Sequence, residues 1–313
     1  MLVVELRDEL RKTLENYSVH APDSAYSSYW SKWVNRYDFK NSRENLRDIY
    51  GDYFTPVRWI PENRMMRLFV AIEIFLTNFF SSPKFFVMSI LKPSYWRLRR
   101  ISRKQGRFMN YANIIALSGF NLICSKLKPI NQTICIIGDG ATNYASLCLS
   151  SNNQFEKIVS INLPEVHIVE TEMLIRGGVE EGQICVLRDL ESLENFFSSN
   201  QRLGILAAQN ANILKGFDVD IFVNVSSMQE MTHEAISIYF NLIKDAKSFF
   251  YCCNRNEKVL PDGSINKFNK YPWGTSDFML YEDCPWMKKT VNLTRPFIRR
   301  QEPHIHALAS YRE

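Results

Sequence analysis

Apolar residues follow different periods in the two parts of this 313-residue chain. Up to about residue 130, they recur at the spacing of about 3.6 that is typical of amphipathic helices. This spacing predicts helices over Leu2–Leu14, Met65–Phe80, Phe85–Trp96 and Tyr111–Leu127. Because proline and glycine separate these segments, we expect several short helices. The pattern predicts a mainly helical N-terminal lobe over residues 1–130.

From Thr133 onward, short apolar runs alternate with helical segments. The predicted strands are Thr133–Ile137, Lys157–Asn162, Leu203–Ala208, Asp220–Val225, Ser248–Cys253 and Ile305–Ser310, with a short one at Gln183–Leu187. The predicted helices are Asn143–Ser151, Glu165–Arg176, Leu190–Phe197 and His233–Ala246. This alternation favours a mostly parallel sheet with helices on both faces, so residues 131–313 are predicted to form an α/β domain.

The segment Leu68–Leu91 is strongly apolar, but Glu73, Asn78 and Lys84 interrupt it. A helix that spans a membrane needs about 20 nearly uninterrupted apolar residues. Ser82-Pro83 is instead typical of a helix start, with serine as the cap and proline at the first helical position. We therefore expect two buried helices here and no transmembrane span.

The most informative segment is TICIIGDGATN, residues 133–143. It predicts a strand, a tight turn at Gly138-Asp139-Gly140 and the start of a helix. Such a turn lets the backbone approach a ligand and directs free N–H groups toward it, which favours a nucleotide-like cofactor. Asn143 stands where the dinucleotide fingerprint has its third glycine, which disfavours a pyrophosphate. The alternative is an ordinary turn between a strand and a helix.

In an open parallel sheet, ligands bind beyond the carboxyl ends of the strands. Polar or glycine-containing loops follow five of the predicted strands: Gly138–Gly140, Asn162–Glu165, Gln209-Asn210, Ser226–Met231 and Asn254-Arg255. We expect these loops to converge. An acid after the second strand can bind a ribose diol, which makes Glu165 a candidate, with Asn162 sharing or replacing that role. Glu165 could equally stabilise the N-terminus of the helix that it begins.

The loop that begins at Ser226 is predicted to lie over the cofactor. Thr232 is a good N-cap for the next helix. Glu230 and His233 are the candidate general bases, because alkylating a sugar hydroxyl requires the removal of its proton. The alternatives are a structural Glu230 and a solvent-exposed His233 in the first helical turn.

Charge is distributed unevenly, with 21 Lys and Arg against 11 Asp and Glu in residues 1–131. Residues 92–107 contain seven basic residues and no acid. Nucleic acid, an anionic membrane surface or a phosphorylated substrate would each suit this stretch, and a solvated helix face is the alternative. Since no nucleic-acid-binding motif accompanies it, we expect no nucleic-acid partner.

The seven cysteines are odd in number and have no CxxC or Cys/His ligand spacing. The N-terminus has no basic leader and no cleavage site. Both features favour a reducing, cytoplasmic location.

Several motifs resemble the sugar O-methyltransferases of bacterial surface-polysaccharide gene clusters. They are INLPE (161–165), SSMQEM (226–231), FFYCCNRNEKVLPDG (249–263), YPW (271–273), CPW (284–286) and HIHALASYR (304–312). The resemblance covers roughly residues 106–313. It implies a Rossmann-like methyltransferase fold and S-adenosylmethionine as the methyl donor. It also accounts for the missing third glycine, since these loops need not hold a pyrophosphate.

The resemblance implies that Gly138, Asp139 and Gly140 approach the methionine part of the donor and that the Asn162–Glu165 turn approaches its ribose. Gln209 and Asn210 are then expected near the adenine, with Ser226 in the covering loop. The candidate acceptor-binding residues are Asn254, Arg255, Trp273 and Trp286, where tryptophan suits stacking on a sugar and arginine suits a phosphate or uronate. Both tryptophans could instead anchor loops, since each follows a proline.

Some sugar methyltransferases use a divalent metal. The available ligands here are Glu230, Asp283, His304 and His306, but no spacing among them demands a metal, so none is expected.

The predicted function is S-adenosylmethionine-dependent methylation of a sugar hydroxyl, in a nucleotide sugar or a surface glycan. Two alternatives stay open: a nicotinamide-dependent sugar oxidoreductase, and a non-catalytic scaffold or binding module in polysaccharide assembly. The expected partner is a sugar or glycan acceptor, phosphorylated or nucleotide-linked, and a homo-oligomer is left open.

Overall fold

The computed structural model describes residues 59–313 except 152, 286–288, 293–296, 301 and 313. The side chains of residues 286–301 are also outside the description. The predicted helix at Leu2–Leu14 and the candidate Trp286 therefore lie outside the described residues.

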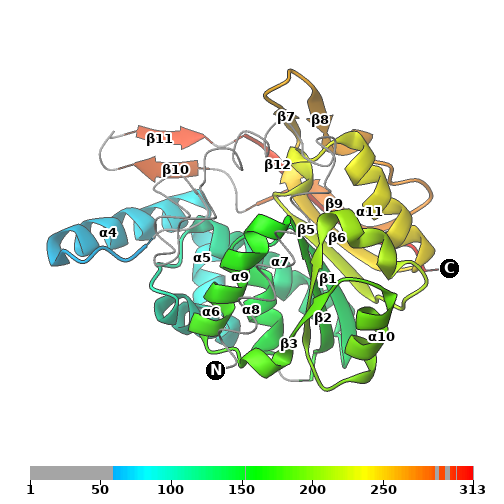
Figure 1. Ribbon diagram of the computed structural model, residues 1–313. Coiled ribbons are helices and arrows are strands. Elements are labelled where there is room, and N and C mark those ends of the chain that lie inside the picture. The colour runs from blue at the N-terminus through cyan, green and yellow to red at the C-terminus, as the bar shows by residue number, and fades with distance from the viewer. Residues whose placement is uncertain (1–58, 152, 286–288, 293–296, 301, 313) are drawn as a thin grey trace.

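A mixed sheet forms the centre of the described structure, with eight strands in the order β3-β4-β2-β1-β5-β6-β12-β9 (Figure 1). Its strands are β1 Gln132–Ile137, β2 Phe155–Asn162, β3 Ile184–Leu187, β4 Leu203–Ala207, β5 Ile221–Val225, β6 Phe249–Arg255, β9 Asp277–Asp283 and β12 His304–Ser310. All neighbouring pairs from β3 to β6 are parallel. Strand β12 is antiparallel to both β6 and β9.

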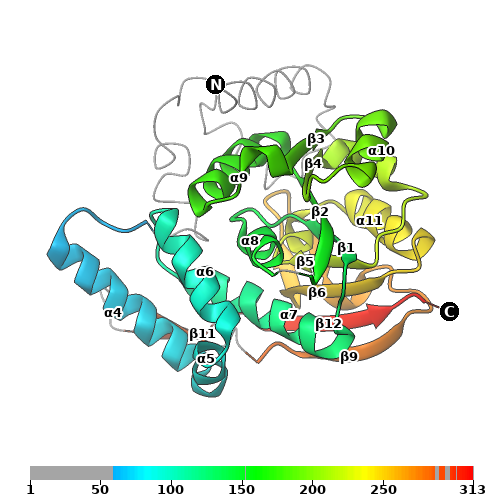
Figure 2. The ribbon, with the colours of Figure 1, turned by 90° about the horizontal axis from the view of Figure 1, so that it is seen from below.

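Helices cover both faces of the sheet (Figures 1 and 2). They are α7 Tyr111–Leu127, α8 Asn143–Leu149, α9 Pro164–Gly177, α10 Leu190–Ser198 and α11 His233–Asp245. Alternation along β1 divides the core, because successive strand residues point to opposite faces. Ile134 and Ile136 belong to a core shared with α7, α8 and α9. Cys135 and Ile137 belong to a second core shared with α10 and α11.

The chain runs outward from β1 through β2 to the edge strand β3, returns to β4 between β2 and β3, and then crosses to β5 and β6 on the other side of β1. This reversal creates a switch point at the carboxyl ends of β1 and β5. The antiparallel β12 then enters the sheet between β6 and β9. A mostly parallel sheet with helices on both faces and a switch point is a Rossmann-like arrangement, and it confirms the predicted fold class. The domain boundary near residue 130 stays a prediction.

Most predicted elements are confirmed with small shifts at their ends, and Tyr111–Leu127 is a helix with those same bounds. The single helix predicted over Phe85–Trp96 is wrong. It is two helices, α5 Pro83–Ile90 and α6 Pro93–Lys104. Pro93 lacks an N–H and disfavours helical backbone at the residue before it. The first helix therefore ends at Ile90, and the second begins at Pro93.

Several short segments form elements that the pattern did not predict. Two hairpins pair β7 Glu257–Val259 with β8 Ile265–Lys267 and β10 Lys289–Asn292 with β11 Phe297–Arg300. Strand β9 at the sheet edge is exposed or half-buried throughout. The remaining described elements are short 3₁₀ helices: η2 Glu181–Gln183, η3 Ala208–Leu214, η4 Met228–Glu230 and η5 Phe268–Lys270.

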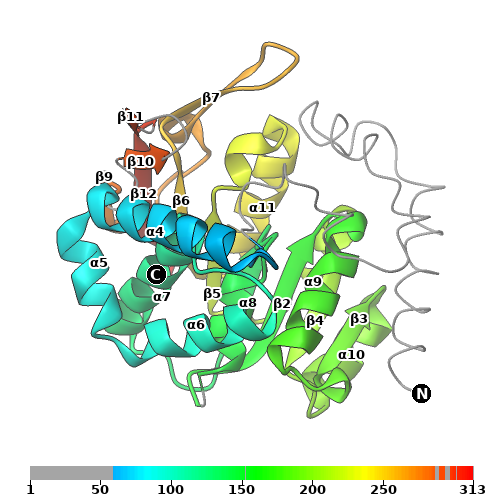
Figure 3. The same ribbon diagram turned by 90° about the vertical axis from the view of Figure 1, so that its left-hand side faces the viewer.

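Helix α4 Arg64–Ser81 lies on one flank of the molecule together with α5 and α6 (Figure 3). The predicted break at Ser82-Pro83 is confirmed. The prediction that both helices are buried is wrong, since Leu68 is 63% exposed, Phe75 54% and Val87 50%. Among helices of the described residues, none alone is long and apolar enough to cross a bilayer; α4 and α5 together meet that test but are bent by 115°.

Candidate functional site

The carboxyl ends of β4, β2, β1, β5 and β6 lie next to one another along one edge of the sheet. Hydrogen bonds join the carboxyl ends of β2, β1, β5 and β6, where the loops begin. The N–H of Gly138 donates to Ile161 O at 2.8 Å. The amide of Asn224 donates to Ile137 O at 2.8 Å, and Asn254 Nδ2 donates to Asn224 Oδ1 at 2.8 Å. The expected convergence of the loops is therefore observed.

The glycine turn adopts backbone that other residues rarely take. Gly138 and Gly140 have φ angles of 72° and 58°. Ser227 lies directly over Gly138, so a Cβ added there would overlap its hydroxyl and stand 2.5 Å from its Cβ. Thr142 is also left-handed, with φ of 55°. The turn thus requires glycine at position 138 both for its φ angle and for the approach of the β5 loop.

Asp139 caps the helix that follows the turn. Its carboxylate accepts hydrogen bonds from Tyr144 N at 3.1 Å and Ala145 N at 2.9 Å. Burial raises the pKa of this carboxyl to about 7, and the nearby charge of Glu170 contributes to the rise. These two N–H groups at the start of α8 are already bonded to protein, which leaves them unavailable to a pyrophosphate.

A buried polar network lies at the end of β2. Asn162 Nδ2 donates to Glu170 Oε1 at 2.9 Å. His167 lies between two oxygens, with Nδ1 2.8 Å from Glu170 Oε2 and Nε2 2.9 Å from Leu206 O of β4. The network fixes the spacing between the ends of β2 and β4. Glu165 stands in the first turn of α9 and is half-buried. That position is compatible with both predicted roles of its carboxylate, binding ribose and stabilising the helix.

Gln209 and Asn210 lie in η3, directly after β4. The side-chain amide of Asn210 donates to Arg188 O at 3.1 Å. Gln209 Nε2 is buried and has no hydrogen-bond partner among the described residues. A buried amide donor that lacks a partner costs free energy, so a ligand that accepts its hydrogen bond would be favoured. The nitrogen acceptors of a purine ring would meet this need.

Ser226 begins the loop after β5 in left-handed backbone, with φ of 59°, and its N–H donates to Cys253 O at 2.8 Å. Glu230 lies at the end of η4, where its Oε1 is 3.0 Å from Lys258 Nζ of β7. Their side chains are only 14% and 13% exposed. Burial raises the pKa of Glu230, and the Lys258 ammonium opposes that rise. His233, at the first position of α11, is exposed.

Amide side chains hold the Glu230 loop in place. The Oδ1 atom of Asn254 accepts from Gln229 N at 3.3 Å, and Gln229 Oε1 accepts from Arg255 N at 2.8 Å. Asn266 of β8 donates to Gln229 O and Met231 O at 3.1 and 2.8 Å. The buried Asn254 therefore has a positioning role in this network.

The other candidate acceptor residues differ in accessibility. The guanidinium of Arg255 is half-buried and pairs with the Glu302 carboxylate at 2.7 Å. Trp273 is buried among aromatic rings, with centroids 5.1 Å from Phe240 and 5.3 Å from Phe268, and its Nε1 donates to Phe268 O at 3.0 Å. The geometry of Trp273 is that of a loop anchor. The Arg255 side chain is still 31% exposed, so an anionic group of an acceptor could reach it from solvent.

The connection between α6 and α7 contributes contacts near the glycine turn that the sequence did not indicate. Gln105 Nε2 donates to Met173 O at 2.8 Å and lies 3.4 Å from Thr142 Oγ1. Arg107 is fully buried, its Nε donates to Gln105 Oε1 at 2.7 Å, and its charge opposes the rise in the pKa of Asp139. Arg107 is the last residue of the basic stretch 92–107. Because its neighbours in the sequence are also cations, the sequence did not indicate that Arg107 is buried.

The described residues contain no group of three or more His, Cys, Asp or Glu side chains placed to hold a metal ion. His304 Nδ1 lies 2.9 Å from Glu302 O, and burial lowers the pKa of this imidazole to about 4. His306 Nε2 lies 3.2 Å from Glu282 Oε1. Both histidines are thus occupied by contacts within the protein.

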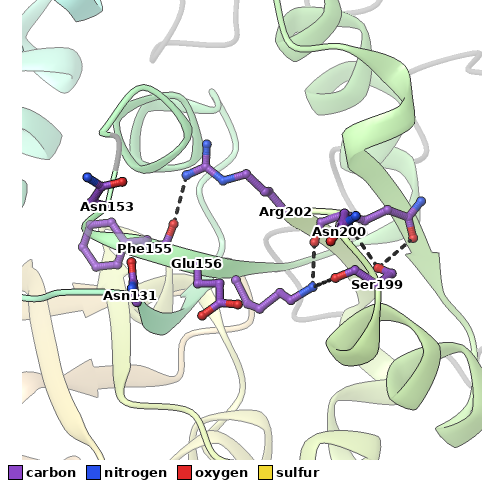
Figure 4. A pocket seen from close by; sticks show the side chains of 9 residues that line it. Asn131, Asn153, Phe155, Glu156, Ser199, Asn200 and Arg202 are labelled. Atoms are coloured by element: carbon purple, nitrogen blue, oxygen red, sulfur yellow. Dashed lines mark hydrogen bonds between the residues drawn. The ribbon is translucent and has the colours of Figure 1, made fainter.

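A cavity of about 400 Å³ lies at the opposite edge of the sheet (Figure 4). Its lining includes Phe155 and Lys157 at the start of β2 and Arg202 before β4. Lys157 Nζ donates to three backbone carbonyls, those of Phe196, Ser199 and Gln201, at 2.6–2.9 Å. The ammonium is therefore satisfied internally, and the cavity is separate from the loops at the switch point.

No family model and no curated protein sequence matches the chain. Solved structures are similar at low identity. An S-adenosylmethionine-dependent methyltransferase from Clostridium acetobutylicum has 12% identity and a TM-score of 0.40, over 66% of this chain and 93% of that one. The YcgJ protein from Bacillus subtilis has 10% identity and a TM-score of 0.40, over 63% and 99%. The TrmK structure from M. capricolum with S-adenosylhomocysteine has 12% identity and a TM-score of 0.32, over 61% and 66%.

Proposed function

We propose that this protein is an S-adenosylmethionine-dependent O-methyltransferase that acts on a sugar hydroxyl. The observation that carries the proposal is the gathering of polar loops around a glycine turn at the switch point of the sheet. Ligands of open α/β sheets bind at this point. The cap that Asp139 forms on α8 favours a cofactor without a pyrophosphate over a dinucleotide.

The residues at this edge fit adenosine joined to an amino acid. Gln209 offers a buried amide donor to the adenine. Glu165 and Asn162, at the end of β2, are the candidates for the ribose. The glycine turn, with Asp139 capping α8, would lie against the methionine part, covered by the loop that begins at Ser226.

S-adenosylmethionine, when bound, supplies a methyl group that its sulfonium already activates. The protein must then align the acceptor oxygen, exclude water and accept the hydroxyl proton. Glu230 is the preferred base, because burial raises its pKa toward the range in which a carboxylate accepts protons efficiently. His233 at the start of α11 is the second candidate.

We propose a sugar as the acceptor because motifs such as SSMQEM (226–231) and HIHALASYR (304–312) resemble those of sugar O-methyltransferases. Arg255 is proposed to bind a phosphate or uronate on that acceptor, with Trp286 as a stacking candidate. Asn254 and Trp273 would act by holding the loops that carry these groups. The reaction is proposed to take place in the cytoplasm, where nucleotide sugars are available.

Calorimetric titration of the purified chain with S-adenosylhomocysteine and with NAD tests the cofactor. Binding of the former alone is expected, and Gly140→Val should abolish it, since valine resists the left-handed φ of 58° at that position. Preferential binding of NAD would favour the oxidoreductase alternative. Unchanged affinity in Gly140→Val would refute the assignment of the turn.

A screen of nucleotide sugars by mass spectrometry then tests the acceptor. A product heavier by one CH₂ group is expected from at least one of them, only in the presence of the methyl donor. Cofactor binding without methyl transfer to any sugar or glycan would favour the scaffold alternative.

A further inference from the structure

Helices α4 and α5 lie along one flank of the molecule (Figure 3), and many of their apolar side chains are exposed to solvent. We call this surface the apolar flank; its exposed members include Leu68, Ile72, Phe75, Phe79, Val87 and Leu91. Leu91 follows α5 and is 78% exposed. Scattered apolar residues are normal on protein surfaces, but a contiguous apolar surface of this kind marks an interaction site.

Most surface helices pack their apolar side on the core, but α4 turns its polar side to the protein and its apolar side to solvent. Its fully buried positions are Thr77, Asn78 and Ser81, which are polar. The spacing of Leu68, Ile72, Phe75 and Phe79 places these side chains on one stripe, because residues three and four apart lie on the same helix face. The apolar stripe therefore points outward, and the polar side of the helix packs against protein.

The segment that forms the apolar flank and α6 is rich in cations. Between Arg64 and Lys104 the chain has nine Lys and Arg and a single acid, Glu73. Exposed cations include Arg64 on α4, Lys84 on α5, and Arg99 and Arg100 on α6. This stretch of α6 is part of the basic sequence that the proposed function leaves unused.

Trp96 is typical of a residue at a membrane interface. It is 49% exposed, and the guanidinium of Arg99 lies 5.2 Å from its ring centroid. Its Nε1 donates to Ile90 O at 2.9 Å, which holds the ring at the junction of α5 and α6. Tryptophan favours the interface because its ring is amphipathic, and arginine binds lipid phosphates there.

We propose that the apolar flank, with the cations of α6, binds the surface of a bilayer that contains anionic lipid. The helices would lie flat in the interface, with the apolar stripe among the acyl chains and the cations at the phosphate level. A second copy of the chain fits less well, since a two-fold interface would bring the same cations face to face. Residues 1–58 also fit less well by charge, because they contain nine basic and nine acidic residues.

Co-sedimentation of the full chain with vesicles tests this proposal, and it requires no cofactor, so its outcome is independent of the proposed function. Vesicles of phosphatidylcholine with phosphatidylglycerol are compared with phosphatidylcholine alone. We expect binding to the anionic vesicles that weakens as salt is raised. The double variant Leu68→Glu/Phe75→Glu should bind at least tenfold more weakly, and so should Arg99→Glu/Arg100→Glu.

Ile130→Glu is the matched control, because Ile130 is 74% exposed but stands before β1, outside the flank. It should bind like the wild type. Circular dichroism and Tm must show that each variant is folded. The proposal is overturned if the wild type does not bind anionic vesicles, or if folded Leu68→Glu/Phe75→Glu binds them normally. It is also overturned if the wild type is a dimer that this variant dissociates while vesicles remain unbound.

Discussion

The contact between Gly138 and Ser227 can be tested by adding one methyl group. In Gly138→Ala, the new Cβ would overlap the Ser227 hydroxyl and stand 2.5 Å from its Cβ, at a backbone φ of 72°. An alanine in left-handed backbone costs about 1–2 kcal/mol. Overpacking adds about 1–3 kcal/mol, since Ser227 must shift. We therefore expect the free energy of unfolding to fall by about 2–5 kcal/mol.

The matched control is Gly216→Ala. Gly216 also has a positive φ, of 88°, but an added Cβ would meet no heavy atom of the described residues within 4 Å. Its cost should be the backbone contribution alone, about 1–2 kcal/mol. Ser227→Gly in the Gly138→Ala background should recover the overpacking part, because Ser227 has an ordinary φ of −110°.

Urea unfolding followed by circular dichroism measures these differences, and titration with S-adenosylhomocysteine measures their effect on the site. Gly138→Ala should weaken cofactor binding more than Gly216→Ala does. Equal destabilisation by the two alanines, with no recovery by Ser227→Gly, would show that the β5 loop does not lie over the glycine turn. The loops after β1 and β5 would then not share one site at this edge.

Three further predictions concern the same edge of the sheet. Glu230→Gln should retain S-adenosylhomocysteine binding but lower kcat by about 10²-fold or more, the scale of losing a general base; near-normal turnover in the methyl-transfer assay would point to His233 instead. Asp139 has a pKa of about 7 in the folded chain, above its ordinary value of 3.8, so the folded state binds more protons between these pH values. Stability should thus fall as pH rises from about 4 to 7, by at most about 1.4 kcal/mol per pH unit, and urea unfolding of Asp139→Asn should lack this slope. Gln209→Ala removes a buried donor that has no partner among the described residues. It should therefore weaken S-adenosylhomocysteine binding about fivefold or more, while the unfolding free energy of the unliganded chain stays unchanged or rises. Equal binding by the Gln209 variant would place the adenine elsewhere.

Elements with a strong local signal could be predicted from the sequence. Helix α7 is an example, since its apolar period begins at a good cap: the Asn110 side chain accepts from Ala112 N at 3.0 Å. The parallel strands were predictable because continuous apolar runs mark strands that are buried on both faces. Strand β9 was not, because it is exposed or half-buried and lacks a clear alternation.

The candidate site likewise has parts that a local sequence signal predicts and parts that it does not. Its loops could be located because each comes directly after a buried strand. Their long-range partners could not, since the pairing of Glu230 with Lys258 joins segments that are distant in sequence. The exposure of Leu68 and Phe75 also could not be predicted from the sequence. A helical period shows that a helix has an apolar face, but it does not show whether that face contacts protein or solvent.

The amide contacts around Gln229 have a mechanical consequence. Neutral hydrogen bonds attach the segment that carries Glu230 to β6 and to the β7–β8 hairpin, so this attachment does not titrate and is little affected by salt. Lys258, which reaches Glu230, is in the same hairpin. Any movement of this loop would therefore carry Glu230, Lys258 and the β7–β8 hairpin together as one rigid unit.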